Sequence, residues 1–320
     1  MTNAVCNIFP LQESESDVLS GCSVFAVRSL LMDANPFRAA RRPVSFRSLF
    51  SSIAPVPVKR LARRMFLWRR RSQFQPYIMT KAVRGDTFPF YIGDAVAHAW
   101  YGGGNDRSPE LGFIRDQMLS AEDLVFDVGS HHGLVAIALA RRCARVLAVE
   151  PNPYNVAILQ RNIDLNYLQN VQICREAAGD STGEVELLLD SLDGGVATEN
   201  REALPTTTVP LVRLDDLADE HGFPSLIKID VEGFEQQALR GAPQILARRP
   251  KIAIEIHTEW ISRYGSSVEE VLTLLGLEQY DAWVMPHGSP VVLPWKGEDY
   301  GSYPPPKFNL FLIPRNTSSR

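Results

Sequence analysis

From Leu124 to the end of the chain, short apolar segments alternate with segments of helical periodicity. The seven apolar segments that we expect to be strands are 124–128, 144–150, 170–176, 226–231, 251–257, 280–286 and 307–314. The helices expected between them lie over 134–142, from Asn152 onward, over 233–247 and after Ser267. Apolar strands that alternate with helices indicate a parallel sheet covered on both faces. The sequence therefore predicts an α/β domain with a doubly wound sheet, which binds ligands beyond the carboxyl ends of its strands.

The chain before this region is organised differently. Residues 1–56 are weakly patterned, and residues 57–73 combine a helical apolar pattern with seven Lys or Arg. Residues 77–92 alternate around a central glycine, which predicts a β-hairpin. Pro109 begins a further predicted helix. We expect a basic, partly disordered N-terminal extension over 1–75 with a helix near 57–73, followed by one domain over 76–320.

Charge is divided unevenly along the chain, although the net charge is only −4. Thirteen Lys or Arg and no acidic residue lie between residues 35 and 84, whereas 19 basic and 33 acidic residues follow from Asp86 onward. A basic arm of this kind can dock on the acidic body, lie on an anionic membrane or bind nucleic acid. An acidic body repels phosphates. Nucleic acid is therefore the least favoured partner, docking is the most favoured, and peripheral membrane contact through the arm stays open.

Cysteine usage and hydropathy bear on the compartment. The four cysteines form no C-x-x-C pair, and no stretch of 18 apolar residues exists, so neither a disulfide framework nor a membrane span is expected. Acids at Glu13, Glu15 and Asp17 stand where a secretory signal would be basic. These features predict a cytoplasmic protein.

The segment VFDVGSHHG, residues 125–133, follows the first strand of the α/β region. Gly129 and Gly133 allow a sharp turn and close packing of the next helix, whose N-terminus then faces a ligand. Glu150 ends the next strand 21 positions after Gly129, which is about the spacing of ~20 at which an acid reaches ribose hydroxyls. One glycine of a dinucleotide motif is missing, and the carboxylate of Asp127 would repel a pyrophosphate. That carboxylate suits a cationic amine, which favours S-adenosyl-L-methionine over a nicotinamide dinucleotide.

Position along the sheet extends the set of candidate cofactor contacts. Asn152 is a favourable N-cap before Pro153, and residues 176–180 follow the third strand, where an adenine would lie. A helix-capping Asp127 and a surface Glu150 would be the structural alternative. The predicted cofactor-binding residues are Asp127, Gly129, Ser130, His131, Gly133, Glu150, Pro151, Asn152, Ala178 and Asp230.

Four ionisable side chains close two otherwise apolar strands. Asp230 and Glu232 end one strand, Glu255 and His257 end the next, and a spacing of two puts the members of each pair on one side of a strand. They form the predicted catalytic set, with a structural salt-bridge cluster as the alternative. An alcohol nucleophile needs a base, and His257 is preferred because its ordinary pKa lies near neutral pH. Glu232 is the second choice, Asp230 would orient the substrate or the cofactor amine, and a divalent metal held by Asp230, Glu255 and His257 is possible but not expected.

These motifs resemble the FkbM-type family of S-adenosylmethionine-dependent methyltransferases over roughly residues 105 to 313. The segments that carry the resemblance are FDVGSHHG (126–133), AVEPNPYNVAILQRNI (148–163), VRLDDL (212–217), IKIDVEGFEQQALRGA (227–242) and IAIEIH (252–257). The run K-x-D-V-E-G-x-E, from Lys228 to Glu235, is the most diagnostic. The resemblance implies a Rossmann-like sheet of seven strands with the last strand antiparallel, and O-methylation of a hydroxyl on a sugar or polyketide-type metabolite. Glu110 aligns with an acid that the family often carries before the first strand.

Two histidines depart from the family's usual loop, which reads D-V-G-A-N-x-G. His131 stands at the Asn position, and because Asn and His both tolerate a positive φ, we expect His131 to adopt one. Adjacent side chains point in different directions, so one metal bound by His131 and His132 together is not expected. We hypothesise that His131 lies near the methionine part of the cofactor. Its protonation between about pH 8 and about pH 5.5 would then weaken cofactor binding.

The sequence thus predicts an O-methyltransferase that uses S-adenosyl-L-methionine and acts on a hydroxylated small molecule or saccharide. The alternative is a non-catalytic S-adenosylmethionine-binding regulator whose basic arm contacts nucleic acid or a membrane. A nicotinamide-dependent oxidoreductase is disfavoured by the missing glycine.

Overall fold

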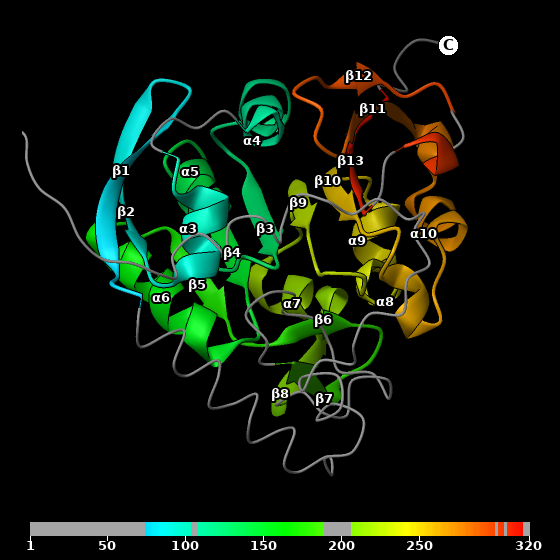
Figure 1. Cartoon of the computed structure of the whole chain (residues 1–320). Helices are drawn as coiled ribbons and strands as arrows, with labels where there is room; N and C mark the ends of the chain where they lie inside the picture. The colour runs from blue at the N-terminus through cyan, green and yellow to red at the C-terminus, as the bar shows by residue number, and fades with distance from the viewer. Residues whose placement is uncertain (1–73, 104–107, 189–205, 298–299, 304–305, 316–320) are drawn as a thin grey trace, which may run out of the picture. The chain divides into compact units, whose positions relative to one another are not determined.

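A computed structural model describes residues 74–103, 108–188, 206–297, 300–303 and 306–315 (Figure 1). These residues all belong to one compact unit, which spans Ile53–Arg320. The helix predicted near 57–73 and almost all of the predicted N-terminal extension lie outside the described residues. The domain boundary near residue 75 therefore stays a prediction. No helix within the described segments is both long enough and apolar enough to cross a membrane.

The centre of the unit is a sheet whose strands run in the spatial order β12-β11-β13-β10-β9-β3-β4-β5. All seven predicted strands are present: β3 (Leu124–Val128), β4 (Arg145–Val149), β5 (Val171–Cys174), β9 (Leu226–Ile229), β10 (Lys251–Ile256), β11 (Tyr280–Pro286) and β13 (Phe308–Pro314). Strands β5, β4, β3, β9 and β10 are parallel, and β13 lies antiparallel between β10 and β11. The prediction of an α/β, Rossmann-like sheet with its last strand antiparallel is confirmed. The short β12 (Leu293–Pro294) adds an eighth strand that we did not predict, because its two residues are exposed and carry no apolar pattern.

Two apolar cores lie on the two faces of this sheet, as expected for strands that are apolar on both sides. Within β3, Val125 belongs to one core, whereas Phe126 and Val128 belong to the other. The first core receives side chains from α5 (Leu134–Ala140) and α6 (Pro153–Leu165). The second receives side chains from α7 (Leu214–His221), α8 (Glu235–Arg240), α9 (Pro243–Ala247) and α10 (Val268–Leu275) (Figure 1). Helices on both faces leave the carboxyl ends of the strands as the place for a ligand.

Local signals set several helix ends. The Asn152 side chain accepts a hydrogen bond from the Tyr154 N–H at the start of α6 (Oδ1 to N, 3.0 Å), so the cap predicted there is confirmed. The Ser267 hydroxyl accepts a hydrogen bond from the Glu270 N–H and caps α10, the helix predicted to follow it. The single helix predicted over 233–247 is wrong: it divides into α8 and α9 at Gly241-Ala242-Pro243. Pro243 lacks the N–H that would continue α8, and it begins α9 instead.

The segment before the sheet contributes a hairpin and two short helices. Strands β1 (Tyr77–Val83) and β2 (Asp86–Ile92) pair antiparallel, as predicted. Helix α3 (Ala95–Tyr101) was not predicted, although Asp94 caps it by accepting hydrogen bonds from two backbone N–H groups. Pro109 begins α4 (Pro109–Phe113), which continues into a π-helical turn over Ile114–Met118. A three-stranded sheet of β6 (Ala177–Gly179), β7 (Gly183–Leu188) and β8 (Thr206–Arg213) was also missed. Strand β6 has only three residues, and β7 and β8 are partly exposed.

Candidate functional site

A cavity of about 530 Å³ lies at the carboxyl ends of β3, β4 and β9. Its lining includes residues that follow each of these strands, together with Glu255 near the end of β10. Ten of the thirteen predicted site residues line it: Gly129, Ser130, His131, Glu150, Pro151, Asn152, Ala178, Asp230, Glu232 and Glu255. The other three, Asp127, Gly133 and His257, are absent from its lining. The structure thus gathers the two predicted constellations, from the loop after β3 and from the ends of β9 and β10, around one space.

The turn after β3 is set by a close approach of two backbones. The Gly129 N–H donates to the Val149 carbonyl (N to O, 2.9 Å), and a Cβ at Gly129 would lie 1.8 Å from the Asp230 carbonyl oxygen. Its φ of +84° is a second reason for glycine. His131 has a φ of +50°, which confirms the conformation predicted for it. This turn brings the loops after β3 and β9 together at the point where the strand order reverses, which is where such sheets bind ligands.

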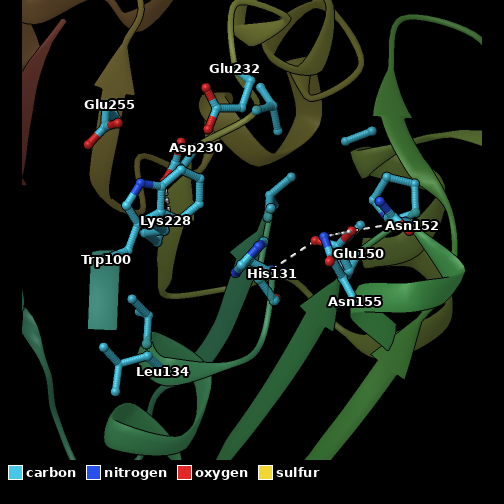
Figure 2. A pocket seen from close by; sticks show the side chains of 18 of the residues that line it. Trp100, His131, Leu134, Glu150, Asn152, Asn155, Lys228, Asp230, Glu232 and Glu255 are labelled. Carbon is cyan, nitrogen blue, oxygen red and sulfur yellow. Dashed lines mark hydrogen bonds and ion pairs between the residues drawn. The ribbon is translucent and has the colours of Figure 1, made fainter. Parts of the chain in front are cut away.

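The carboxylate of Glu150 is held by the loop after β3 and by the residues at the start of α6. It accepts hydrogen bonds from the backbone N–H of His131 (N to Oε2, 2.8 Å), from the N–H of Asn152 (N to Oε1, 2.9 Å) and from the Asn155 amide (Nδ2 to Oε1, 3.2 Å). Figure 2 shows these contacts as dashed lines within the pocket. Burial raises the pKa of Glu150 to about 7, although the three hydrogen bonds act to lower it. Oε2 accepts one of these three bonds and keeps a further lone pair with which it can accept a hydroxyl of a ligand.

Asp127 lies beneath the loop rather than on the cavity wall. Its side chain is completely buried, and neither carboxylate oxygen has a hydrogen bond to a described residue. Burial raises the pKa of Asp127, and the positive charge of Lys228 opposes this shift. Burial therefore favours the neutral form of Asp127, and the structure gives this residue no direct contact with the cavity.

His257 is completely buried and stands among four carboxyl groups. Its Nδ1 lies 2.7 Å from Oε1 of Glu235, and its Nε2 lies 3.2 Å from Glu232 Oε2, 3.2 Å from Glu255 Oε1 and 3.9 Å from Asp230 Oδ1. Glu232 has a φ of +55°, a conformation that non-glycine residues retain mainly at functional sites. The cluster therefore has carboxylates that face the cavity and an imidazole behind them.

Protonation in this cluster follows from its geometry. Burial acts to lower the pKa of His257, but hydrogen bonding to Glu232, Glu235 and Glu255 raises it well above its ordinary value. Burial raises the pKa of Glu232. Burial acts in the same way on Glu255, but His257 and Lys307 outweigh it and lower that pKa to about 2. An imidazolium at His257 holds its proton, whereas Glu232 is the carboxylate of this group that is better able to accept one.

Two observations bear on a metal. Ligand atoms of Asp230, Glu255 and His257 lie within 4.8 Å of one another, so their spacing could hold a divalent cation. Lysines already neutralise two of these groups, since Lys228 Nζ lies 3.1 Å from Asp230 Oδ2 and Lys307 donates to Glu255. With His257 protonated as well, this donor set is poorly suited to a metal.

The side chains of His131 and His132 stack on each other, so the prediction that they point in different directions is wrong. The ring centroids of His131 and His132 are 4.0 Å apart at an interplanar angle of 18°. The positive φ of His131 turns its side chain over the next one. Burial and the neighbouring His132 lower the pKa of His131 well below its ordinary value.

Several residues of the cavity wall were not assigned from the sequence. They come mainly from the segment before the sheet and from the last loop: Lys81, Trp100, Tyr101, Asn155, Lys228 and Lys307. Asp94 is a favourable N-cap, and this signal could have placed Trp100 and Tyr101 on a helix before the sheet. Glu110, noted only for its alignment with the family, also lines the cavity, and burial together with Glu255 raises its pKa to about 7. Lys307 has no local signal, since one lysine before a strand is unremarkable in sequence.

Comparison with known proteins gives four further findings. Residues 127–282 match the methyltransferase FkbM domain. The chain is 29% identical over 156 residues to the hexuronic acid methyltransferase AglP of Haloferax volcanii, a match that covers 48% of this chain and 64% of that protein. Among solved structures, it is similar to Trm5b from Pyrococcus abyssi (14% identity, TM-score 0.41, 75% of this chain and 55% of that one). It is also similar to a precorrin-6y C5,15-methyltransferase from Geobacter metallireducens (12% identity, TM-score 0.39, 65% and 87%). Residues 127–282 of this chain are therefore similar to the FkbM family of methyltransferases, the family that the sequence motifs resemble.

Proposed function

We propose that this domain transfers a methyl group from S-adenosyl-L-methionine to a hydroxyl of a saccharide or a related small metabolite. The observation that carries the proposal is that one cavity is lined both by the loop after β3 with Glu150 and by the carboxylates that follow β9 and β10. A relative whose name describes it as a hexuronic acid methyltransferase supports a sugar-type acceptor. O-methylation is favoured because a sugar-type acceptor offers oxygen nucleophiles, which are its hydroxyls and, in a hexuronic acid, also a carboxylate.

The residues after β3 and β4 fit the proposed cofactor. Gly129 lines the cavity and lets the loops after β3 and β9 approach closely, because a Cβ there would lie 1.8 Å from the Asp230 carbonyl oxygen. The Glu150 carboxylate is fixed where it can accept ribose hydroxyls. Asp230, Glu232 and Glu255 line the cavity and offer carboxylates that suit the cationic groups of the cofactor. A pyrophosphate would meet these same charges, which disfavours a dinucleotide.

The acceptor hydroxyl needs a group that takes up its proton, and Glu232 is the residue that we propose for this step. S-adenosyl-L-methionine supplies an electrophilic methyl group, whose bond to sulfur breaks with its electron pair going to sulfur while the acceptor oxygen bonds to carbon. Glu232 lines the cavity, and its raised pKa makes it a stronger base than Glu255. His257 was the first choice from the sequence, and we now propose that it positions Glu232 (Nε2 to Oε2, 3.2 Å). Asp230, paired with Lys228, is proposed to orient the substrate or the cofactor amine.

A divalent metal is not part of the proposed mechanism. The pairs Lys228–Asp230 and Lys307–Glu255 supply positive charge that a metal would otherwise bring. Turnover should therefore change by less than about twofold when the protein is treated with a chelator and assayed without added metal.

Calorimetry and mass spectrometry together test the proposed function. S-adenosyl-L-methionine should bind to the purified protein, NADH should not, and Glu150→Ala should weaken the binding by about tenfold or more. With the cofactor in place, a mixture of neutral and acidic monosaccharides should yield a product heavier by one methyl group. Absence of cofactor binding would refute the proposal, whereas binding without transfer to any hydroxylated acceptor would favour the non-catalytic regulator.

A further inference from the structure

Trp100 leaves a large aromatic surface open at the cavity wall. Its relative exposure is 51%, and among the five exposed large hydrophobic side chains of the described residues, Trp100 alone lines the cavity. Tryptophan is highly buried on average, whereas the Trp100 ring stays open on a concave wall of the kind that binds ligands. The indole is therefore placed where a ligand can cover it.

Neighbouring rings support this indole. Its centroid lies 5.2 Å from the His131 ring and 6.2 Å from the Tyr101 ring. Tyr101 in turn is fixed by an edge-to-face contact with Phe90 (5.8 Å, 85°) and by its hydroxyl, which lies 3.0 Å from Nδ1 of His131. A platform that is already held in place loses little conformational freedom when a ligand stacks on it.

The cavity wall beyond the indole of Trp100 is charged, whereas the indole itself is apolar. Figure 2 shows Trp100 projecting into the pocket toward the side that carries Asp230 and Glu255. Five ionisable side chains of this region line the cavity: Lys228, Asp230, Glu232, Glu255 and Lys307. A ligand in this space must offer an apolar face to Trp100 and several hydrogen-bonding groups to the wall.

We propose that Trp100 is the stacking platform of the acceptor subsite and that the acceptor is a pyranose, an inference that rests on the proposed function and specifies its substrate class. A pyranose carries C–H groups on its ring faces and hydroxyls around its edge, so one orientation satisfies both walls. A planar phenol could also stack on the indole, but it would leave most of the charged wall without hydrogen bonds, which is costly once water is excluded.

The test compares sugar binding in four proteins that are each saturated with S-adenosylhomocysteine: the wild type, Trp100→Ala, Trp100→Phe and Tyr167→Ala. Tyr167 is a matched control because it is 87% exposed and is absent from the cavity lining. D-Glucose, D-galactose and their uronic acids are titrated by calorimetry. The best of the four probes should bind about tenfold more weakly to Trp100→Ala, within about threefold of wild type to Trp100→Phe, and unchanged to Tyr167→Ala. Affinity for S-adenosylhomocysteine should change by less than about twofold in all variants.

Three results would overturn the inference. Trp100→Ala could bind the sugar as tightly as wild type, or could lose affinity for S-adenosylhomocysteine by the same factor, in which case the ring serves the cofactor. Catechol, used as a planar probe, could bind while none of the four sugars does. Failure of wild type to bind S-adenosylhomocysteine would instead contradict the proposed function, and the two failures are therefore distinguishable.

Discussion

Backbone N–H groups hold the carboxylate of Glu150 in the part of the pocket formed by the loops after β3 and β4, which we call the cofactor half. In the part formed by the ends of β9 and β10, the acceptor half, ionisable side chains hold one another around His257. Backbone amides cannot change their protonation, whereas the members of the His257 cluster can. The cofactor half is thus suited to recognising one ligand shape, and the acceptor half is suited to moving a proton.

The largest expected effect is that of Glu232→Gln, which separates proton transfer from cofactor binding. The amide keeps the size of the side chain but cannot accept a proton, so turnover should fall by about 10²- to 10⁴-fold. Cofactor affinity, measured by calorimetry, should stay within about twofold because Glu232 belongs to the acceptor half. The rate of the wild type should also fall as the pH drops through the raised pKa of Glu232, and this limb should be absent from the residual rate of the variant. A variant that kept more than a tenth of wild-type turnover would return His257 to the role of base.

His257→Ala should damage folding as well as catalysis. It leaves the completely buried Glu235 without the imidazole at 2.7 Å, and removing one partner of a buried ion pair costs about 3–5 kcal/mol in the free energy of unfolding. Because the folded-state pKa of His257 is raised, its contribution is fully present below its ordinary pKa of about 6.5 and is lost as the pH rises through the folded-state value. Urea unfolding should therefore show the largest difference from wild type at about pH 6. Exposed His287, replaced by Ala, is the control, and equal stability of both variants would contradict the cluster's proposed role.

Gly129→Ala tests the contact that joins the two halves. Gly85 is a matched control, since its φ of +86° is close to the +84° of Gly129, yet a Cβ there would meet nothing within 4 Å. Positive φ alone should cost Gly85→Ala about 1–2 kcal/mol. The clash with the Asp230 carbonyl should cost Gly129→Ala a further ~1–3 kcal/mol and should weaken binding of S-adenosylhomocysteine. Equal loss of unfolding free energy in the two variants would show that the loops after β3 and β9 can separate.

The cofactor half was predictable because its signals are local. Gly129 and Glu150 belong to one strand–helix–strand unit, in which the spacing along the chain fixes the separation in space. The positive φ of His131 followed from its residue type. Asp127 shows where such reasoning ends, because a motif position does not reveal whether a carboxylate faces the ligand or lies beneath the loop.

The acceptor half depends on contacts between distant segments. Residues two apart lie on one side of a strand only while the strand continues. This rule does not apply to Glu232 and His257, because β9 ends at Ile229 and β10 at Ile256. His257 turns toward Glu235 at the start of α8, a partner that the strand pattern does not indicate. Trp100 and Lys307 both line the cavity although they lie far apart in the sequence. No spacing in the sequence links residues that only tertiary packing brings together.

The smallest effect that we predict is a pH dependence of ligand affinity, which identifies the group in the cofactor half that titrates. Glu150 has a pKa of about 7, and a ribose hydroxyl donates best to its ionised form. Affinity for S-adenosylhomocysteine should therefore fall about tenfold one pH unit below that pKa and should level off above it. Glu150→Gln should bind more weakly but with no dependence on pH between about 6 and about 8. His131→Asn should keep the wild-type dependence, because the pKa of His131 is already far below this range and Asn preserves the positive φ. A dependence that vanished in His131→Asn and persisted in Glu150→Gln would instead identify His131 as the titrating group, as the sequence alone suggested.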